Sequence, residues 1–419
     1  YLFAQRLPIR FNYRKLAMRP YLWDGLYGGS LLFQALSRFV MFVYAADVLG
    51  MDEYSHWPII IAFAGYSVVM GRGLLPYLAI QLPILHGREN TEQLFSAFIF
   101  ARRKVAVDWG LALLIALSFL FGKEYKFISL GILIAIAWSV CQLHVKLFRS
   151  LEKIHTLFLS TVLGAFVFLV AGLLIIKTSI YELFFCYFLS LLVQAVFLFW
   201  QAQKLAGLRE QISKPAGPGF YADAKLDYMA SVFLFAVLGT FDRWLAEFFL
   251  MDTSGSYSVV VFSMMIGFLF LTISSQIIEP KIYRASSSVS RKTSMSAYGA
   301  VLCVLFVAIF LLIYLALFQF KIPFTGNIRA VRIEFITGFS LFLVLMPGVV
   351  FSAALKSVKM ISIVNLSSLL AILVGLSCFL ILELSGIGAG EIASIQASLF
   401  FCYLFYSVAN YLSYRRWVK

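Results

Sequence analysis

The chain has little of what catalytic and metal-binding proteins use. Only 13% of its 419 residues are charged, and it holds four histidines and five cysteines. Neither residue type shows the spacing of metal ligands, and the cysteines fall inside apolar runs, so we expect packing thiols and no metal site. A glycine-rich phosphate loop of the Walker type is also missing, which argues against ATP hydrolysis by this chain. We expect no cofactor.

Apolar residues are abundant instead. They make up 62% of the chain, the mean hydropathy is +0.91, and apolar runs of about 20 residues, the length that crosses a bilayer, recur along the sequence. The runs are continuous rather than alternating, which favours helices over barrel strands. We therefore predict an all-α polytopic membrane protein with twelve spans: 24–48, 56–83, 104–121, 126–147, 155–176, 181–203, 225–251, 255–281, 293–318, 333–352, 358–382 and 388–412.

The basic residues predict the orientation. Most of the 34 Lys and Arg, Lys146 and Lys356 among them, fall on the face that holds both termini. The opposite face receives only Lys123, Lys126, Lys177, Lys321, Arg329 and Arg332. Cytoplasmic loops carry the excess of positive charge, so both termini are predicted to be cytoplasmic. The net charge of +14 then reports topology and not nucleic-acid binding.

The chain divides into similar halves. A basic, aromatic segment, 1–21, is expected to lie along the headgroups; residues 22–203 form an N-lobe of six helices, 204–224 a cytoplasmic linker, and 225–419 a C-lobe of six helices. Several residues recur at offsets of about 205, including Arg38 with Arg243 and Pro76 with Pro280. This spacing favours a parallel duplication, although glycine and tyrosine recur by chance near membrane interfaces.

Three arginines fall deep inside predicted spans: Arg38, with Gln34 one helical turn before it, Arg72 between two glycines, and Arg243. Such a charge costs about 2.5–3.5 kcal/mol at the bilayer centre. Arginine binds phosphate through two parallel hydrogen bonds and keeps its charge when desolvated. We expect these residues to line a central cavity and hold a diphosphate. Snorkelling, or an ion pair between helices, is the alternative for Arg38 and Arg72.

Acidic residues accompany the third arginine. Asp242 precedes Arg243 and Glu247 follows it by one turn, so direct neutralisation of Arg243 is one interpretation. Two carboxylates beside one arginine leave an acid able to exchange a proton, which makes Asp242 and Glu247 candidates for ion coupling. Glu279 is expected to be solvated near an interface.

These residues carry a family resemblance. Arg38-Phe39 through Ala46-Asp47-Val48-Leu49-Gly50, and Asp242-Arg243 through Gly255 to Pro280, resemble segments of the multidrug/oligosaccharidyl-lipid/polysaccharide (MOP) exporter superfamily, and within it the Wzx-type flippases. The architecture of that superfamily covers nearly the whole chain. The quoted motifs are short and degenerate.

The resemblance implies a function. The chain would translocate an undecaprenyl-diphosphate-linked glycan repeat unit from the cytoplasmic to the periplasmic leaflet of the bacterial cytoplasmic membrane, by alternating access and without ATP hydrolysis. We expect the direction to come from a proton or sodium gradient or from removal of the product outside. Such flippases serve the synthesis of O-antigen and lipopolysaccharide. Membrane lipids, a polysaccharide polymerase and a chain-length regulator would be the other partners.

Two alternatives stay open. A drug exporter of the same superfamily would favour an acidic or neutral cavity. A membrane glycan polymerase or glycosyltransferase would need a catalytic acid or base and a sizeable outer loop. The longest predicted outer loop, around Gln319 to Arg332, is short, which favours a transporter over an enzyme.

Overall fold

The structure, a computed structural model, describes residues 19–71, 73–120, 126–205, 225–249, 257, 260–261, 271, 279–284, 288–315, 332–386 and 391–417. Within these ranges it is helical and contains no strand. Most of the predicted headgroup segment, nearly all of the predicted linker and most of the predicted span 255–281 lie outside the described residues.

The helices follow one another along the chain. They are α1 (Arg19–Leu49), α2 (Met51–Tyr54), α3 (His56–Ser67), the 3-10 helix η2 (Val68–Gly71), α4 (Leu74–Gly87), α5 (Thr91–Leu120), α6 (Lys126–Ser150), α7 (Ile154–Ile175), α8 (Ile180–Gln203), α11 (Lys225–Leu238), α12 (Phe241–Phe249), α14 (Ser288–Tyr314), α16 (Arg332–Ser357), α17 (Ile361–Leu384) and α18 (Ile392–Trp417). Residues 279–284 form a further helical segment before α14.

Seven of the described helices, α1, α6, α7, α8, α16, α17 and α18, contain stretches long and apolar enough to cross a membrane. In a bilayer each backbone N–H and C=O group must find its partner within the protein, and a continuous helix provides this. The prediction of an all-α, multi-pass membrane protein is confirmed. The ends of these helices lie within a few residues of the predicted ends.

Other predicted spans differ from the helices observed. Residues 56–83 include α3, η2 and most of α4; the helix is interrupted at Gly73, which has a φ of 72° and directly precedes α4. Residues 225–251 include a turn at Gly239 and Thr240 that separates α11 from α12. The apolar run predicted as a helix at 104–121 is the second half of a longer helix, α5, which begins at Thr91. The polar and basic residues before the run are helical as well.

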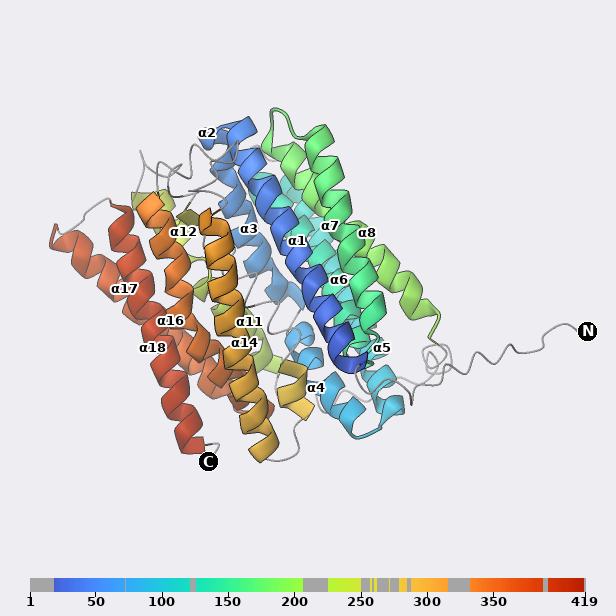
Figure 1. Ribbon diagram of the computed structural model, residues 1–419. Coiled ribbons are helices and arrows are strands. Elements are labelled where there is room, and N and C mark those ends of the chain that lie inside the picture. The colour runs from blue at the N-terminus through green and yellow to red at the C-terminus, as the bar shows by residue number, and fades with distance from the viewer. Residues whose placement is uncertain are drawn as a thin grey trace, which may run out of the picture.

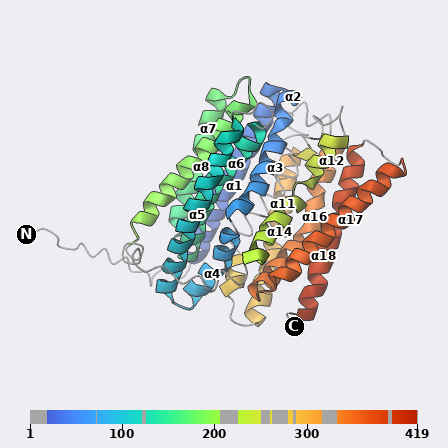
Figure 2. The ribbon, with the colours of Figure 1, turned by 180° about the vertical axis from the view of Figure 1, so that it is seen from behind.

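The helices form two packed groups. Helices α1 to α8 contact one another, and α11 to α18 contact one another; between the groups, α11 lies against α3, η2 and α4. Figures 1 and 2 show the blue-to-green group beside the yellow-to-red group, with α11 and α3 between them. We call the end of the bundle where α1 begins and α18 ends the terminal face, and the end near α2 the opposite face (Figure 1).

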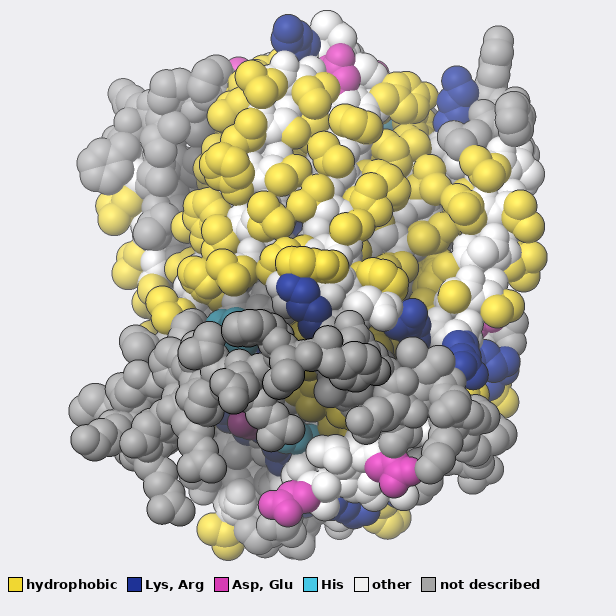
Figure 3. Space-filling view, turned by 90° about the vertical axis from the view of Figure 1, so that its right-hand side faces the viewer, with side chains coloured by type: hydrophobic (Ala, Val, Ile, Leu, Met, Phe, Trp, Pro, Cys, Tyr) yellow, Lys and Arg dark blue, Asp and Glu magenta, His cyan; other side chains and the backbone are white. Residues whose placement is uncertain are grey.

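The outer surface fits a lipid environment. Large apolar side chains are exposed along α7 and α8, including Phe166 at 58% and Val196 at 58%. Figure 3 shows this side of the molecule: hydrophobic side chains cover a broad band, and charged side chains gather above and below it. A soluble protein rarely exposes so large an apolar surface, whereas a membrane protein presents it to the lipid tails.

Candidate functional site

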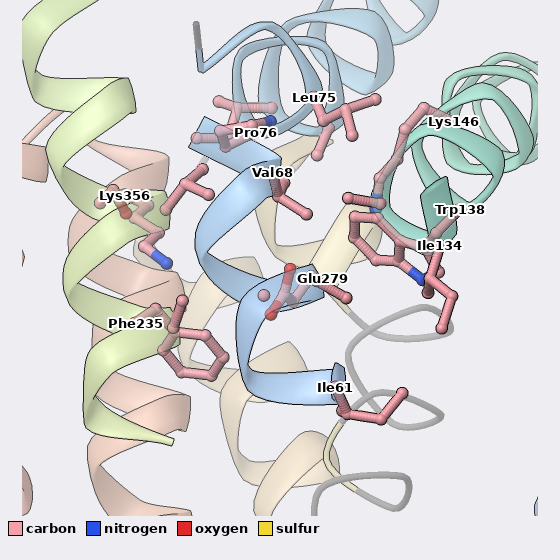
Figure 4. A pocket seen from close by; sticks show the side chains of 18 of the residues that line it. Ile61, Val68, Leu75, Pro76, Ile134, Trp138, Lys146, Phe235, Glu279 and Lys356 are labelled. Atoms are coloured by element: carbon pink, nitrogen blue, oxygen red, sulfur yellow. The ribbon is translucent and has the colours of Figure 1, made fainter. Parts of the chain in front are cut away.

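A cavity of about 450 Å³ lies between the two groups of helices. It is lined by side chains of α3, α4, α6 and α8 from the first group, and by side chains of α11, α16 and the segment 279–284 from the second. Most of the wall is apolar, with Val68, Ile134, Trp138 and Phe235 among the lining residues (Figure 4). Its volume is within the range of about 300–1,000 Å³ that is typical of ligand pockets.

Three charged side chains line this cavity among the described residues: Lys146 from α6, Lys356 from α16 and Glu279 from the segment 279–284. In Figure 4, Glu279 lies between the two lysines, which enter from different helix groups. Each lysine interacts electrostatically with Glu279. The hydroxyl of Tyr283 donates a hydrogen bond of 3.2 Å to a carboxylate oxygen of Glu279.

A further cation lies close to this group. Arg149 is on α6, one turn beyond Lys146, is only 6% exposed, and interacts electrostatically with both Lys146 and Glu279. Lys146, Arg149 and Lys356 therefore face one carboxylate among the described side chains of the site. Charges in a largely apolar wall are costly unless they are compensated. An anionic ligand between Lys146 and Lys356 would add to this compensation.

Contacts join the helix groups next to the cavity on the side of α12. The indole N–H of Trp244 donates to the hydroxyl of Tyr66 at 2.7 Å, and the hydroxyl oxygens of Thr240 and Tyr66 are 2.6 Å apart. The rings of Tyr66 and Trp244 are stacked, and Phe63 meets Trp244 edge to face. These residues connect α3 with the start of α12, toward the opposite face (Figure 1).

A second set of contacts joins the groups near the terminal face. The guanidinium of Arg284 forms an ion pair with Glu152 and donates to the backbone carbonyl of Ser150 at 3.3 Å. Tyr77 of α4 meets Tyr228 of α11 edge to face, with ring centroids 5.6 Å apart. The cavity thus has contacts between the two groups on either side of it.

Arg38 and Gln34, predicted as phosphate ligands, are partly buried on α1 and are not among the residues that line the cavity. The Arg38 guanidinium lies over the ring of Tyr187, 5.2 Å from its centroid, and Tyr187 does line the cavity. Arg38 is therefore one side chain removed from the cavity, in a cation–π contact that partly compensates its charge. Direct contact of Arg38 or Gln34 with substrate stays a prediction.

Arg243 is 7% exposed and also lies away from the cavity lining. Its guanidinium donates to the backbone carbonyl of Pro58 at 3.1 Å, which links α12 to α3. Asp242 is 2% exposed, interacts electrostatically with Arg243, and accepts a 2.7 Å hydrogen bond from Tyr257. The bond to Pro58 gives Arg243 a structural role in joining the two helix groups, whereas the partners of Asp242 belong to its own group. The roles of Arg243 and Asp242 in substrate binding and ion coupling stay predictions.

Two predicted site residues cannot be placed. Arg72 lies outside the described residues, between Gly71 and Gly73 at the break before α4. Glu247 belongs to α12, but its side chain lies outside the described part of the structure. Arg38 and Arg243 do not line the cavity described above, and a role of Arg72 in it stays a prediction.

The charged lining residues were not predicted as a site. The sequence places Lys146 at the end of a predicted span and Lys356 in a predicted loop, both on the cytoplasmic face, and it predicts a solvated Glu279 near an interface. The internal repeat could have indicated that these two lysines belong together. Lys146 and Lys356 lie near the ends of the fourth predicted helix of each half, at nearly the offset that relates Arg38 to Arg243.

Solved structures of membrane transporters resemble this chain. The eukaryotic MATE transporter AtDTX14 matches with a TM-score of 0.67 and 13% sequence identity, over 94% of this chain and 95% of that one. An outward-facing multidrug resistance MATE transporter of the MOP superfamily matches with a TM-score of 0.68 and 11% identity, over 95% and 96%. A MATE protein in complex with MaL6 gives 0.68 and 11%, over 94% of each chain.

No protein-family model matches the sequence. No curated protein matches it either. At identities of 11–13% the similarity to the solved structures establishes the fold and not the substrate. The chain therefore has the two-lobe helical fold of MATE transporters, with the charged cavity between its lobes.

Proposed function

We propose that this protein exports an anionic lipid-linked substrate, an undecaprenyl-diphosphate-linked glycan repeat unit, from the cytoplasmic to the periplasmic leaflet of a bacterial cytoplasmic membrane. The observation that carries the proposal is the pair of lysines, Lys146 and Lys356, that enter one cavity from opposite lobes. The fold supports a transporter rather than an enzyme, by analogy with the matched structures.

A diphosphate suits this arrangement. Its two phosphate groups can each accept charge-assisted hydrogen bonds from an ammonium group, which are stronger than those between neutral groups. One diphosphate held by Lys146 and Lys356 would then bridge the lobes. Movement of the lobes would carry the bound group, because a ligand shifts a conformational equilibrium only through contacts that differ between the two states.

The rest of the substrate would lie elsewhere. The cavity volume of about 450 Å³ is sufficient for the diphosphate and the first sugar, but not for a polyprenyl chain. The apolar outer surface keeps that chain in the lipid. The excess of basic residues on the terminal face supports cytoplasmic termini, so that export would carry the diphosphate from the terminal face to the opposite face.

A flipping assay tests the proposal. Proteoliposomes would receive geranylgeranyl-diphosphate-linked N-acetylglucosamine, labelled on the sugar with nitrobenzoxadiazole, in the outer leaflet; dithionite then measures the fraction that has left this leaflet. The wild type should flip the compound. Lys146→Gln and Lys356→Gln should each slow flipping by about tenfold or more, the expected loss of a hydrogen bond to a charged group.

Lys104→Gln is the matched control, because it removes the same charge from an exposed position on α5, outside the cavity. This variant should flip the compound at the wild-type rate. Equal flipping by the control and both cavity variants would contradict the proposed role of the lysines. Absence of flipping by the wild type would contradict the substrate class.

A second candidate function is drug export. The matched structures include a multidrug resistance transporter, and the cavity combines the carboxylate of Glu279 with aromatic side chains such as Trp138 and Phe235, a combination that can bind an organic cation. Uptake of tetraphenylphosphonium by the same vesicles separates the two functions. Drug export predicts saturable transport that is lost in Glu279→Gln and retained in Lys146→Gln.

A further inference from the structure

Glu279 occupies a central place among the charges of the cavity. It lines the same cavity as Lys146 and Lys356 and interacts electrostatically with both, and also with Arg149 of α6. Tyr283, on its own segment, donates a hydrogen bond to its carboxylate. Tyr298 of α14 and Tyr406 of α18 also interact with it electrostatically. One carboxylate therefore interacts with basic groups of both lobes.

The charges of the two lysines have to be compensated when no substrate is bound. After a substrate leaves, the lobes must return with the cavity empty, and water must be excluded from it on the way. Without a counter-charge, the ammonium groups of Lys146 and Lys356 would be desolvated together in a largely apolar wall, which is strongly unfavourable. Glu279 lines the same cavity and interacts electrostatically with both, so its carboxylate can compensate part of their charge.

We propose that Glu279 is an internal counter-anion, which partly compensates the charges of Lys146 and Lys356 while the cavity is empty and yields both lysines to the substrate's phosphate groups when it is filled. The inference rests on the proposed function and adds a step to it. Substrate and Glu279 compete for the same two lysines. The empty protein can return because Glu279 takes the place of the substrate's charge, so the competition speeds the return step and weakens substrate binding.

The opposing explanation is a purely structural carboxylate that positions Tyr283. The variant Glu279→Gln separates the two, because the amide oxygen of Gln can still accept the hydrogen bond from Tyr283 while the negative charge is lost. A structural role predicts that binding and transport of the variant resemble those of the wild type. A counter-anion predicts tighter substrate binding together with a defect in net transport.

The experiment compares two modes in the proteoliposomes described above. Net flipping is measured with the labelled compound in the outer leaflet and no substrate in the inner leaflet, so that each cycle includes an empty return. Exchange is measured with unlabelled geranylgeranyl diphosphate in the inner leaflet, so that loaded protein returns. In Glu279→Gln, net flipping should fall about fivefold or more relative to exchange, and geranylgeranyl diphosphate should bind about fivefold or more tightly.

Two further variants sharpen the test. Glu92→Gln, which removes an exposed carboxylate on α5 outside the cavity, should leave the ratio of net flipping to exchange unchanged. Glu279→Gln combined with Lys356→Gln removes one lysine together with its counter-charge, and should restore part of this ratio while weakening binding. This double variant also tests the inference should Glu279→Gln alone be poorly folded.

The outcomes separate the two proposals. A wild-type protein that flips the compound, with an unchanged ratio and unchanged binding in Glu279→Gln, would overturn the counter-anion and leave the proposed function intact. A fall of net flipping and exchange by the same factor would also overturn it. A wild-type protein that neither binds nor flips the diphosphate would overturn both.

Discussion

Gly73 places the backbone of one lobe directly against that of the other, and its replacement by alanine gives a sharp prediction. The residue has a φ of 72° and precedes α4. A Cβ atom built on it would lie 2.6 Å from the Cβ of Tyr228 and 2.7 Å from the backbone nitrogen of Met229, both on α11. The obstacle includes backbone, so it cannot be relieved by a side-chain rotation.

The magnitude follows from two contributions. Carbon atoms pack best at about 3.5–4.0 Å, so α11 would have to move away by about 1 Å. Such overpacking costs about 1–3 kcal/mol, whereas the left-handed backbone conformation adds about 1–2 kcal/mol whether the lobes are together or apart. If separation of the lobes on this side relieves the clash in Gly73→Ala, the clash shifts the equilibrium toward the separated state by a factor of about 5–150.

Distance measurements between spin labels on the two lobes provide the assay. Labels at Glu92 on α5 and Lys292 on α14, both exposed, report separation near the terminal face. Gly73→Ala should move population to longer distances. Gly50→Ala is the matched control: Gly50 also has a positive φ, of 78°, but no other atom lies within 4 Å of its Cβ position, so this variant should keep the wild-type distances. Wild-type distances and stability in Gly73→Ala would refute the reasoning.

Three other substitutions have expected outcomes. Arg243→Ala should lower the free energy of unfolding by about 3–5 kcal/mol, seen as a lower Tm in detergent, because Asp242 then stays buried without its cation; an unchanged Tm would show that Asp242 has other compensation. Arg284→Ala should lengthen the same label distance, by an equilibrium shift below about fivefold because its ion pair with Glu152 is partly exposed. Tyr66→Phe removes the hydroxyl that accepts the hydrogen bond from Trp244, so the indole that covers residue 63 should be held less firmly. A cysteine introduced at Phe63 should then react faster with a maleimide, while the label distance stays unchanged; unchanged reactivity would contradict that role of Tyr66.

Much of the fold is predictable from the sequence because the membrane imposes a simple rule. A span must be apolar and must satisfy its own backbone hydrogen bonds, so α6, α7 and α8 end close to the predicted positions. The glycines beside Arg72 signal a weak point in the second predicted span, and the helix is interrupted at Gly73. The turn that separates α11 from α12 has no comparable proline or pair of glycines.

The site was harder to predict because hydropathy gives depth but not direction. Arg243 is as buried as its place in an apolar run indicates, yet it is directed to the carbonyl of Pro58 and not into the cavity. Lys146 lies at the end of an apolar run, where most lysines reach the headgroups, and only the packing of α6 against the other helices places it in the cavity wall. Packing between lobes cannot be read from composition.

The central claim is that the cavity binds a diphosphate through lysines of both lobes, and a calorimetric titration tests it most directly. Geranylgeranyl diphosphate and the neutral alcohol geranylgeraniol would be titrated into the purified wild type and into the double variant Lys146→Gln, Lys356→Gln. The wild type should bind the diphosphate at least about tenfold more tightly than the alcohol, and the double variant should lose this preference. Equal preference for the diphosphate in both proteins would contradict the claim.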